Sequence, residues 1–576
     1  MRSFGATSKA VRKFLLSTTA VLALSAGDAA AHTVSIGYSF AGPGAVNLWY
    51  GSYHNTATFN EANVQLVGTA YYALVNFNLI TATKPAGLID GVTNFYSNTA
   101  GTALVGVPQQ VASTDGSGGA FNPATQSILH WQGATFTGLR PGVYTFTYNP
   151  LALPTVEWHP INSIIESNTF TLTAFDILGI PGYRFFGTNV NQRSVATGLD
   201  NAIGAGGYNQ AIYNIAALPP AAMANALTQL SGEHATAAAR ASFQSLNAFM
   251  ALTLDPWAAA TRCGPQGPSA DFGPAAYRQA IPQKQEPNDR PCSSNEWSVW
   301  ASAYGGTNTT RGDFTTIGSH NTTINTGGMA VGVDYRPMYG TVMGVAMSAG
   351  SNSWNLVDGL GGAKTDTFQA AAYASTRFDA MYLSAAVAFG NSRTTQDRTV
   401  TIFTSDAFTA KYNTNTIGTR IETGYRLNTA DVGVTPYAAI QAQYFRSPNY
   451  SETPTYGAPD YALDFSARKA TQARFEAGSW FDFRIPIDAT ATLSTRARAA
   501  WIYDMQSTTQ IAASFQSLPG SNFTVLGATP VTNAALVSAA AELKLRTGFS
   551  LSAKFDSEIG SRSTTLIGTG TLRYQW

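Results

Sequence analysis

The fold is decided by the stretch STTLIGTGTLRYQW, from Ser563 to Trp576. Its side chains alternate in polarity with a period of two, which is the period of a β-strand. The apolar face holds Leu566, Leu572, Tyr574 and Trp576 with Gly568 and Gly570 between them, and the other face holds Thr565, Thr569, Thr571, Arg573 and Gln575, with Ile567 as an exception. Apolar side chains outside and polar ones inside suit a wall between lipid and a wet lumen. The stretch therefore predicts the last strand of an outer-membrane β-barrel.

The composition of the 576-residue chain is typical of an exported β-protein. Charged residues make up 12% of the sequence, about half the usual share of a soluble domain, and aromatic residues also make up 12%. Mean hydropathy is −0.05, and no apolar run after the N-terminus has the length of a membrane-spanning helix. The net charge of +1 favours no nucleic acid or other strongly charged partner, and no motif calls for a cofactor.

The N-terminus has the three parts of a secretory signal peptide. The basic part is Arg2, Lys9, Arg12 and Lys13. The apolar core Phe14–Ala26 follows, and the small residues before His32 predict cleavage between Ala31 and His32. Residues 1–31 are therefore the predicted signal peptide. The alternative is an uncleaved anchor, which the short apolar core disfavours.

Residues 32–186 are predicted to be a small all-β domain, most simply a β-sandwich. Short runs rich in β-branched and aromatic residues alternate with clusters of Gly, Pro and Asn. Leu139–Gly142 has the composition of a turn, and it leads into the predicted strand Val143–Tyr148. The other predicted strands are 33–40, 73–80, 127–130 and 169–174.

This predicted domain shows no catalytic or metal-binding motif. The Gly/Ser cluster at Asp115–Gly119 is better interpreted as a loop than as a nucleophile motif. His54, His130 and His159 are isolated, without the spacing of metal ligands. His130 and His159, each next to a tryptophan, are predicted to be half-buried strand residues. We therefore expect no catalytic residues, no metal and no enzymatic activity, although a missing motif is weak evidence.

Residues 187–258 are predicted to be a helical linker. Pro219-Pro220 opens a long Ala-rich run that Asp255-Pro256 ends, roughly 50 Å long if it is one helix. Gly232 is a candidate break between two helices. The run is too polar for lipid and slim enough for a barrel lumen, so part of it is predicted to lie there. The alternative is an amphipathic helix packed on a soluble domain.

Cys263 and Cys292 flank a loop rich in Pro, Gly and Gln within residues 259–295. In an exported protein, one disulfide closing this loop is the natural expectation. Two free thiols are the alternative, which an oxidising compartment disfavours.

Residues 296–576 repeat the pattern of the last strand and predict a 12-stranded antiparallel transmembrane β-barrel. Long polar connections, such as 391–411, alternate with tight turns, as outer loops and periplasmic turns do. Trp297 and Trp300 are among the aromatic residues assigned to a girdle at the strand ends. On each strand the charges share one face, and the charges predicted to face the lumen are Asp334, Arg420, Glu422, Arg426, Arg474, Glu476, Asp482, Arg496, Arg498, Glu542, Lys544, Lys554, Asp556 and Glu558.

Three local patterns resemble monomeric, type V autotransporters. The first is Ala226–Glu233, which contains Leu230-Ser231-Gly232-Glu233 and resembles the family's helix before the barrel. The second is Trp297–Gly306 with Val331–Tyr335, which is similar to its first strands. The third is Leu572–Trp576, with Trp576 in place of the more frequent Phe. The resemblance covers about residues 190–576 and leaves the N-terminal segment uncovered.

The resemblance implies a mechanism and a set of partners. The secretory translocon would deliver the chain to the periplasm, and the outer-membrane assembly machinery would read Leu572, Tyr574 and Trp576 and insert a monomeric barrel in the lipid. The passenger would cross unfolded, because about twelve strands enclose too narrow a lumen for a folded domain. The linker would stay in the lumen, paired with the inward charges. Residues 259–295 would then lie in the periplasm.

Two functions of the N-terminal domain remain open at this point. One is a display or adhesion domain at the cell surface, and the other is a hydrolase passenger. An open porin is a third, weaker hypothesis, because the linker should plug the lumen. Arg311-Gly312-Asp313, in the first predicted outer loop, could be an integrin ligand but is more simply ordinary turn chemistry.

Overall fold

The computed structural model describes residues 31–42, 44–53, 62–69, 71–100, 103–111, 121–150, 158–159, 167–254, 296–338, 340–378, 380–428, 433–488 and 490–576. The chain forms two compact units, divided near Leu172 and Thr173. Residues 1–30, His54, the loop at 115–119 and the pair Cys263 and Cys292 lie outside the described residues. The predicted signal peptide and disulfide therefore stay predictions, as does cleavage before His32, although Ala31 and His32 begin the first strand.

The first unit contains two β-sheets, as the sequence predicted. The larger sheet has the strand order β5-β8-β2-β1-β6-β7, and β10 pairs with β1. The smaller sheet is antiparallel with the order β11-β9-β3-β4. The strands are β1 (Ala31–Gly42), β2 (Ala45–Ser52), β3 (Ala62–Gly68), β4 (Tyr71–Asn76), β5 (Leu79–Thr81), β6 (Asn94–Ser97), β7 (Leu104–Val105), β8 (His130–Thr137), β9 (Gly142–Pro150), β10 (Trp158–His159) and β11 (Ser167–Leu172).

Aromatic side chains join the two sheets of this unit. Tyr50 of β2 meets Phe146 of β9 edge to face at 6.2 Å, and Tyr38 of β1 stacks on Phe170 of β11 at 5.1 Å. Such ring pairs stabilise a core beyond the area they bury. Trp131 is 1% exposed and His130 4% exposed, so both are core residues rather than half-buried ones.

The predicted turn at Leu139–Gly142 is confirmed, since β8 ends at Thr137 and β9 begins at Gly142. The hydroxyl of Tyr144 donates to the carbonyl of Arg140 at 2.7 Å and accepts from its N–H at 2.9 Å. One side chain of the following strand therefore fixes both backbone groups of a turn residue.

Residues 173–186 fold with the second unit, so the β-sheet unit ends at Leu172 rather than near 186. Thr173 and Asp176 form a capping box that starts the first helix. Asn189 and Asn209 cap the next two helices through their side-chain oxygens. These elements are α1 (Ala174–Leu178), η1 (Tyr183–Phe185), α2 (Val190–Gly204) and α3 (Gln210–Ile215).

The Ala-rich run after Pro219, to which the name linker refers from here on, consists of two helices separated by a break at Gly232, as the sequence allowed. Gly232 has φ +65°, a left-handed conformation that favours glycine. No helix in the described part of the chain is long and apolar enough to cross a membrane. The segments are α4 (Pro220–Gln229), η2 (Glu233–Ala237) and α5 (Ala238–Thr253).

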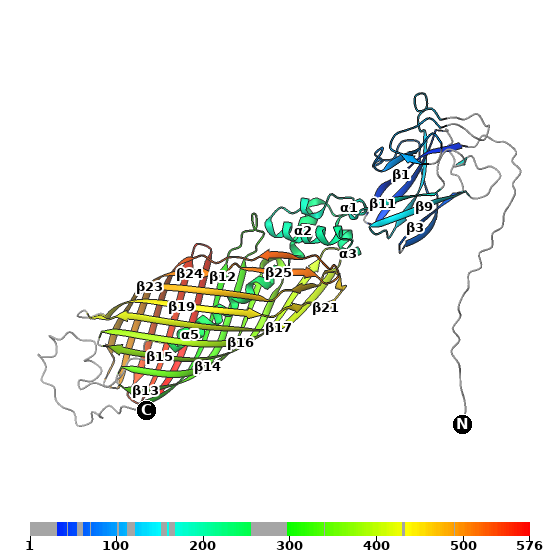
Figure 1. Ribbon diagram of the computed structural model, residues 1–576. Coiled ribbons are helices and arrows are strands. Elements are labelled where there is room, and N and C mark those ends of the chain that lie inside the picture. The colour runs from blue at the N-terminus through cyan, green and yellow to red at the C-terminus, as the bar shows by residue number, and fades with distance from the viewer. Residues whose placement is uncertain are drawn as a thin grey trace, which may run out of the picture. The chain divides into compact units, whose positions relative to one another are not determined.

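Twelve long antiparallel strands form a closed barrel around α5 (Figure 1). The last strand pairs with the first from Ser298↔Gln575 to Thr310↔Ser563, and β17 pairs with β19, which closes the ring. The strands are β12 (Glu296–Thr310), β13 (Thr322–Met338), β14 (Thr341–Leu356), β15 (Gly362–Phe378), β16 (Met381–Thr401), β17 (Ser405–Tyr425), β19 (Gly433–Ser447), β23 (Arg468–Pro486), β24 (Ala491–Gln506), β27 (Asn533–Leu545), β28 (Phe549–Gly560) and β29 (Ser563–Gln575).

Burial alternates along these strands as the sequence predicted. On β29, Leu572 is 51% exposed on the outside, whereas Arg573 is 8% exposed on the inside. Ile567, the exception on the polar face, points inward and packs against the hydrophobic cluster that includes Leu246 of α5. The apolar side chain of Ile567 on the inner face is therefore explained by its contact with the helix.

Tight turns and longer connections lie at opposite ends of the barrel. The prediction of a long loop at 391–411 is wrong, because β16 continues to Thr401 and β17 begins at Ser405. Arg398 and Val400 are both buried, so the polar residues of this stretch are the inner face of extended strands. Trp300 is also misassigned. It is 4% exposed, and its Nε1 donates to the hydroxyl of Tyr373 at 2.9 Å inside the barrel.

A small sheet and the helices α1–α3 lie at the end with the longer connections, which we call the loop end. Asn191 of α2 makes two 2.8 Å hydrogen bonds with the backbone of Leu526, and a side chain at Gly198 would meet the carbonyl of Ser521 at 2.8 Å. The sheet is β20 (Tyr450–Ser451), β22 (Leu463–Phe465), β25 (Gln510–Phe515) and β26 (Phe523–Leu526). The other short elements are η4 (Val357–Gly359), η5 (Pro459–Tyr461), β21 (Thr453–Tyr456), which pairs with β17, and β18 (Leu427–Asn428), which pairs with the start of β19 at the end with the tight turns.

Candidate functional site in the barrel lumen

The lumen is occupied by α5, which is narrow because many of its residues are alanine or serine. Small side chains let the helix approach the wall closely, so that Leu246 reaches Gly418 of β17. Near the middle of the barrel, Leu246, Phe249 and Met250 pack with Trp300 and Tyr304 of β12. Closer to the loop end, a second cluster joins α5 to the wall, and it includes Phe243, Ile324, Trp354 and Phe445. Packing therefore holds the helix over its whole length.

Few polar contacts join α5 to the wall. Arg240, the only charged residue of α5, donates to Asn308 Oδ1 at 2.8 Å and to the carbonyl of Ala528 at 3.3 Å. Gln369 Nε2 donates to Ser245 Oγ at 3.1 Å. A buried arginine without a carboxylate is costly unless its donors find acceptors, and these oxygens accept from it here.

Glu476 of β23 is the centre of an ionic network on the inner wall. Its Oε2 lies 2.7 Å from Arg420 Nη2 of β17, and its Oε1 lies 2.8 Å from Arg474 Nε. Arg498 of β24 lies 3.9 Å from the same carboxylate and 2.8 Å from Asp556 of β28. In a low-dielectric wall such a network is stable only when each member has its partners.

All the charges predicted to face the lumen lie on the inner wall and form ion pairs. The pairs outside the Glu476 centre include Arg426 and Arg496 with Asp482, Lys544 with Glu542, Lys554 with Asp556, and Asp334 with Arg573. Two further pairs, Arg420 with Glu422 and Arg474 with Glu558, complete the set of predicted charges. In the described part of the chain these pairs join wall to wall and none reaches α5, which differs from the expectation that the charges would also pair with the helix.

The space left beside α5 is small. One polar cavity of about 80 Å³ lies between α5 and the strands that carry Arg474, Asp504 and Glu558. Another of about 60 Å³ lies below Thr253 and Leu254, at the end with the tight turns. A water molecule takes about 30 Å³ in the liquid, so each cavity holds only a few. The helix therefore plugs the lumen, which argues against an open porin.

The predicted motif Leu230-Ser231-Gly232-Glu233 lies where the linker enters the barrel. Leu230, Ser231 and Glu233 are all buried, and Glu233 contacts His320 in the connection between β12 and β13. None of His320, Arg398 and Glu452 was selected from the sequence, because each fell in a stretch expected to be a polar loop. For Arg398 a signal existed, since the period-two pattern continues through it in β16.

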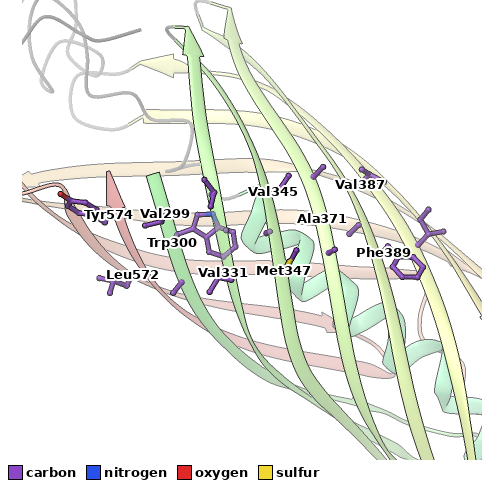
Figure 2. A pocket seen from close by; sticks show the side chains of 18 of the residues that line it. Val299, Trp300, Val331, Val345, Met347, Ala371, Val387, Phe389, Leu572 and Tyr574 are labelled. Atoms are coloured by element: carbon purple, nitrogen blue, oxygen red, sulfur yellow. The ribbon is translucent and has the colours of Figure 1, made fainter. Parts of the chain in front are cut away.

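The outer face of the barrel is a continuous apolar surface. Figure 2 shows part of it, a shallow hollow of about 990 Å³ where side chains such as Val299, Val331, Val387 and Leu572 line the outside of the strands and a helix lies behind them. At the end with the tight turns, Trp576 is 58% exposed and stacks on Tyr574. Aromatic residues at strand ends and aliphatic ones between them are the surface that lipid requires.

No group of His, Cys, Asp or Glu side chains in the described ranges is arranged to hold a metal ion. In these ranges the lumen consists of a wall of paired charges around a slim, largely apolar helix of the same chain.

These features define an outer-membrane β-barrel that holds the linker to its own N-terminal part in its lumen. Residues 299–556 match the family described as Autotransporter beta-domain. The C-terminal domain of this chain therefore belongs to the autotransporter β-domain family of type V secretion. It lies in the outer membrane, of the Gram-negative type, in contact with lipid, and it translocates a passenger across that membrane.

Solved structures of other barrels are similar to this chain at low identity. The translocator domain of the autotransporter NalP from Neisseria meningitidis is 14% identical, with a TM-score of 0.39 over 49% of this chain and 89% of that one. The β domain of the Bordetella autotransporter BrkA is 17% identical, with a TM-score of 0.36 over 48% and 98%. The transport unit of AIDA-I from Escherichia coli is 12% identical, with a TM-score of 0.32 over 50% and 92%. No curated protein sequence matches the chain.

Proposed function

We propose that the barrel carries the N-terminal β-unit to the cell surface and displays it there. The direction of the linker supports this proposal. Its N-terminal part contacts the loop end, where Gln229 Oε1 accepts from the N–H of Thr401 at 2.7 Å, and its C-terminal residue Leu254 lies at the end with the tight turns. In outer-membrane barrels the longer loops face outward and the short turns face the periplasm. Residues before Pro220 are then outside, and residues 259–295 are in the periplasm.

The partners of this process follow from the same orientation. The secretory translocon would deliver the chain, and the barrel-assembly machinery would read the outward face of β29, with Leu572, Tyr574 and Trp576. The N–H of Trp576 donates to the carbonyl of Trp297 at 3.1 Å, so this end of the last strand is joined to the first strand in the finished barrel. The backbone edge of β29 must therefore be unpaired before the barrel closes.

A role in adhesion or another surface interaction is supported by one face of the smaller sheet. The strands β3, β4, β9 and β11 contain no charged residue. Tyr72 is 66% exposed and Leu74 is 50% exposed on β4, and Val67 and Val143 continue the same apolar surface on β3 and β9. An exposed apolar patch on a sheet is a common mark of an interaction surface. We propose that the passenger binds a partner there and is not an enzyme.

External protease on intact cells tests the display. We expect it to remove the N-terminal β-unit and to leave a heat-modifiable fragment that ends at Trp576, because the barrel and the plugged lumen shield their backbone. Mass spectrometry of the retained membrane fragment identifies its start. Protection of the N-terminal unit until the outer membrane is broken would place that unit in the periplasm and contradict the proposal.

The double substitution Tyr72→Ser with Leu74→Ser tests the interaction. We expect it to reduce cell-surface or matrix binding by about tenfold, since losing two exposed anchor side chains typically costs more than 1 kcal/mol. Val92→Ser with Val107→Ser is the matched control, because these residues are also about 60% exposed but lie outside that sheet. Equal binding by both variants contradicts the assignment, and hydrolysis of ester or peptide substrates by the released unit would support the hydrolase alternative.

The tripeptide Arg311-Gly312-Asp313 makes hydrogen bonds with other residues of its own loop. The carboxylate of Asp313 accepts from the N–H of Thr316 at 3.0 Å, which lowers the pKa of Asp313 below its ordinary value. The N–H of Gly312 donates to Asn321 at 3.0 Å. These bonds support the turn interpretation of the tripeptide over a role as an integrin ligand.

A further inference from the structure

The break in the linker exposes backbone carbonyls that a regular helix would use internally. Between Gln229 and Ala238 the chain passes from an α-helix through the left-handed Gly232 into the 3₁₀ segment η2. Such a change interrupts the regular hydrogen-bond pattern, so carbonyls near it take partners from outside the helix. A side chain at Gly232 would meet Leu463 of β22 at 2.8 Å, so the small sheet at the loop end fits the break closely.

Three side chains from different strands donate to these carbonyls. Arg398 Nη1 of β16 donates to Gln229 O at 3.1 Å. Trp354 Nε1 of β14 donates to His234 O at 2.9 Å, and Arg468 Nη1 of β23 donates to Thr236 O at 2.8 Å. The three strands lie in one half of the ring, which runs from β14 through β16 and β17 to β19 and β23, so the donors face the linker from that half of the wall. We call Trp354, Arg398, Arg468 and His320 the collar.

His320 completes the collar through the motif residue Glu233. The N–H of His320 donates to Glu233 Oε1 at 2.7 Å, and its ring Nδ1 lies 2.6 Å from Oε2. The side chains of both residues are almost fully buried, at 4% and 1% exposure. Arg398 is fixed from behind by Glu452, with Nε 2.9 Å from Oε1. This collar donor is therefore oriented by a group outside the linker.

By contrast, few polar contacts, such as those of Arg240 and Ser245, fix the position of α5 itself along the barrel axis. Its small side chains and apolar contacts would be partly reproduced after a shift of one turn, about 5.4 Å. The carbonyls at the break, however, meet the collar donors at one position only, because the non-helical geometry occurs once in the linker.

We propose that the collar recognises this break and sets the position at which the linker stops in the barrel, so that α5 stays in the lumen after the passenger has left. The proposal rests on the display function proposed above. Trp354, Arg468 and His320 act as positioning residues: their hydrogen bonds form when Glu233 and the break arrive at the loop end, and they oppose further movement in either direction.

The test measures the position of the helix with cysteine pairs. In a background with Cys263→Ser and Cys292→Ser, Gln369→Cys on β15 is combined with Ser245→Cys, its present neighbour. Two further pairs combine it with Ala241→Cys or Ala248→Cys, which lie about one turn away on either side. A short bis-maleimide is added to whole cells. It cross-links position 369 to the cysteine introduced in α5 only where the two residues face each other in the membrane-inserted barrel.

The collar variant is Trp354→Phe with Arg468→Gln, which removes two donors and leaves Arg398 with its carboxylate partner. Trp300→Phe is the matched control, because it also removes a buried indole N–H inside the barrel, but that N–H donates to Tyr373 of the wall and not to a carbonyl of the linker, and phenylalanine keeps a ring packed against α5. We expect the parent and the control to link 245 to 369. In the collar variant we expect that product to fall by about fivefold or more, as the loss of one to two hydrogen bonds implies, with linkage at 241 or 248 in its place.

The outcomes separate the collar from the display function. An unchanged linkage pattern in a heat-modifiable collar variant overturns the proposal. If the double variant does not form the heat-modifiable barrel, Trp354→Phe alone decides by the same pattern, since it keeps an aromatic ring at that site. External protease is applied to the same cells: a protected N-terminal unit in the parent would contradict display, whereas the linkage pattern would still report on the collar.

Discussion

A barrel without its linker is expected to conduct ions at least about tenfold better than a barrel that keeps it, because an empty twelve-stranded wall encloses a water-filled lumen. The change is a chain in which residues 1–31 are joined directly to 255–576. In the intact chain α5 occupies the lumen, and the cavities beside it include two of about 80 and 60 Å³. Conductance in planar bilayers and sensitivity of cells to large antibiotics measure the opening.

The matched control joins residues 1–31 to 220–576, which removes the passenger and keeps the linker. Its conductance should stay as low as that of the full chain. Equal conductance of the two shortened chains would mean that α5 does not close the lumen. High conductance of the control would mean that residues 32–219, which include α1–α3 at the loop end, take part in closure.

Replacing Glu476 with leucine is expected to destabilise the barrel by about 3–5 kcal/mol, because it leaves buried arginines without their shared carboxylate. Glu476 contacts Arg420, Arg474 and Arg498, and each of the three is at most 10% exposed at its side chain. The measurement is the urea midpoint of the heat-modifiable band in detergent, together with the temperature at which that band disappears.

Glu542→Leu is the control for this substitution. Glu542 is equally buried but pairs with Lys544, whose side chain is 21% exposed and is able to turn toward water. We expect a loss of about 1 kcal/mol or less there, as for a partly exposed pair. Equal losses in the two variants would show that burial of a carboxylate, and not the three-arginine centre, decides the stability.

The self-paired wall and the plugging helix together explain how one lumen can let a chain pass and then hold its end. The charges of the ionic network pair with each other on the wall, so they need no partner from the linker, and a passing segment does not have to break those pairs. The linker in turn presents an apolar, narrow helix that gains free energy by burial against Trp300, Tyr304 and their neighbours. Retention is then a matter of packing and of the collar, with little contribution from ion pairs.

Some of the structure was predictable because it depends on local patterns. The alternation in Ser563–Trp576 and in the other strands has a period of two whatever the neighbours are, so it predicted the twelve-stranded barrel and the inward side of each charge. Gly232 in a helical run was a candidate break in the linker, since a left-handed residue is most easily a glycine, and the sequence left open whether the linker is one helix or two. The two-sheet N-terminal unit followed from short β-rich runs between turn residues.

The same local reasoning failed where inward polar residues resembled a loop. Arg398 and its neighbours belong to extended strands of the barrel, and a stretch of Thr, Asp and Arg gives no sign of that until its alternate residues are seen to be buried. Trp300 was placed at the membrane surface, because sequence spacing does not tell which of two aromatic residues on adjacent faces turns inward.

By itself, the sequence determined that this chain is an outer-membrane barrel with a slim helical linker before it and charges on the inner wall. The tertiary structure alone decided which groups meet: Asp334 with Arg573, Glu476 with Arg420, and Glu233 with His320. The physical reason is the closure of the ring. Alternation is a property of each strand, whereas the pairing of residues distant in sequence depends on how the strands are staggered when the last one joins the first and on where the linker stops between them.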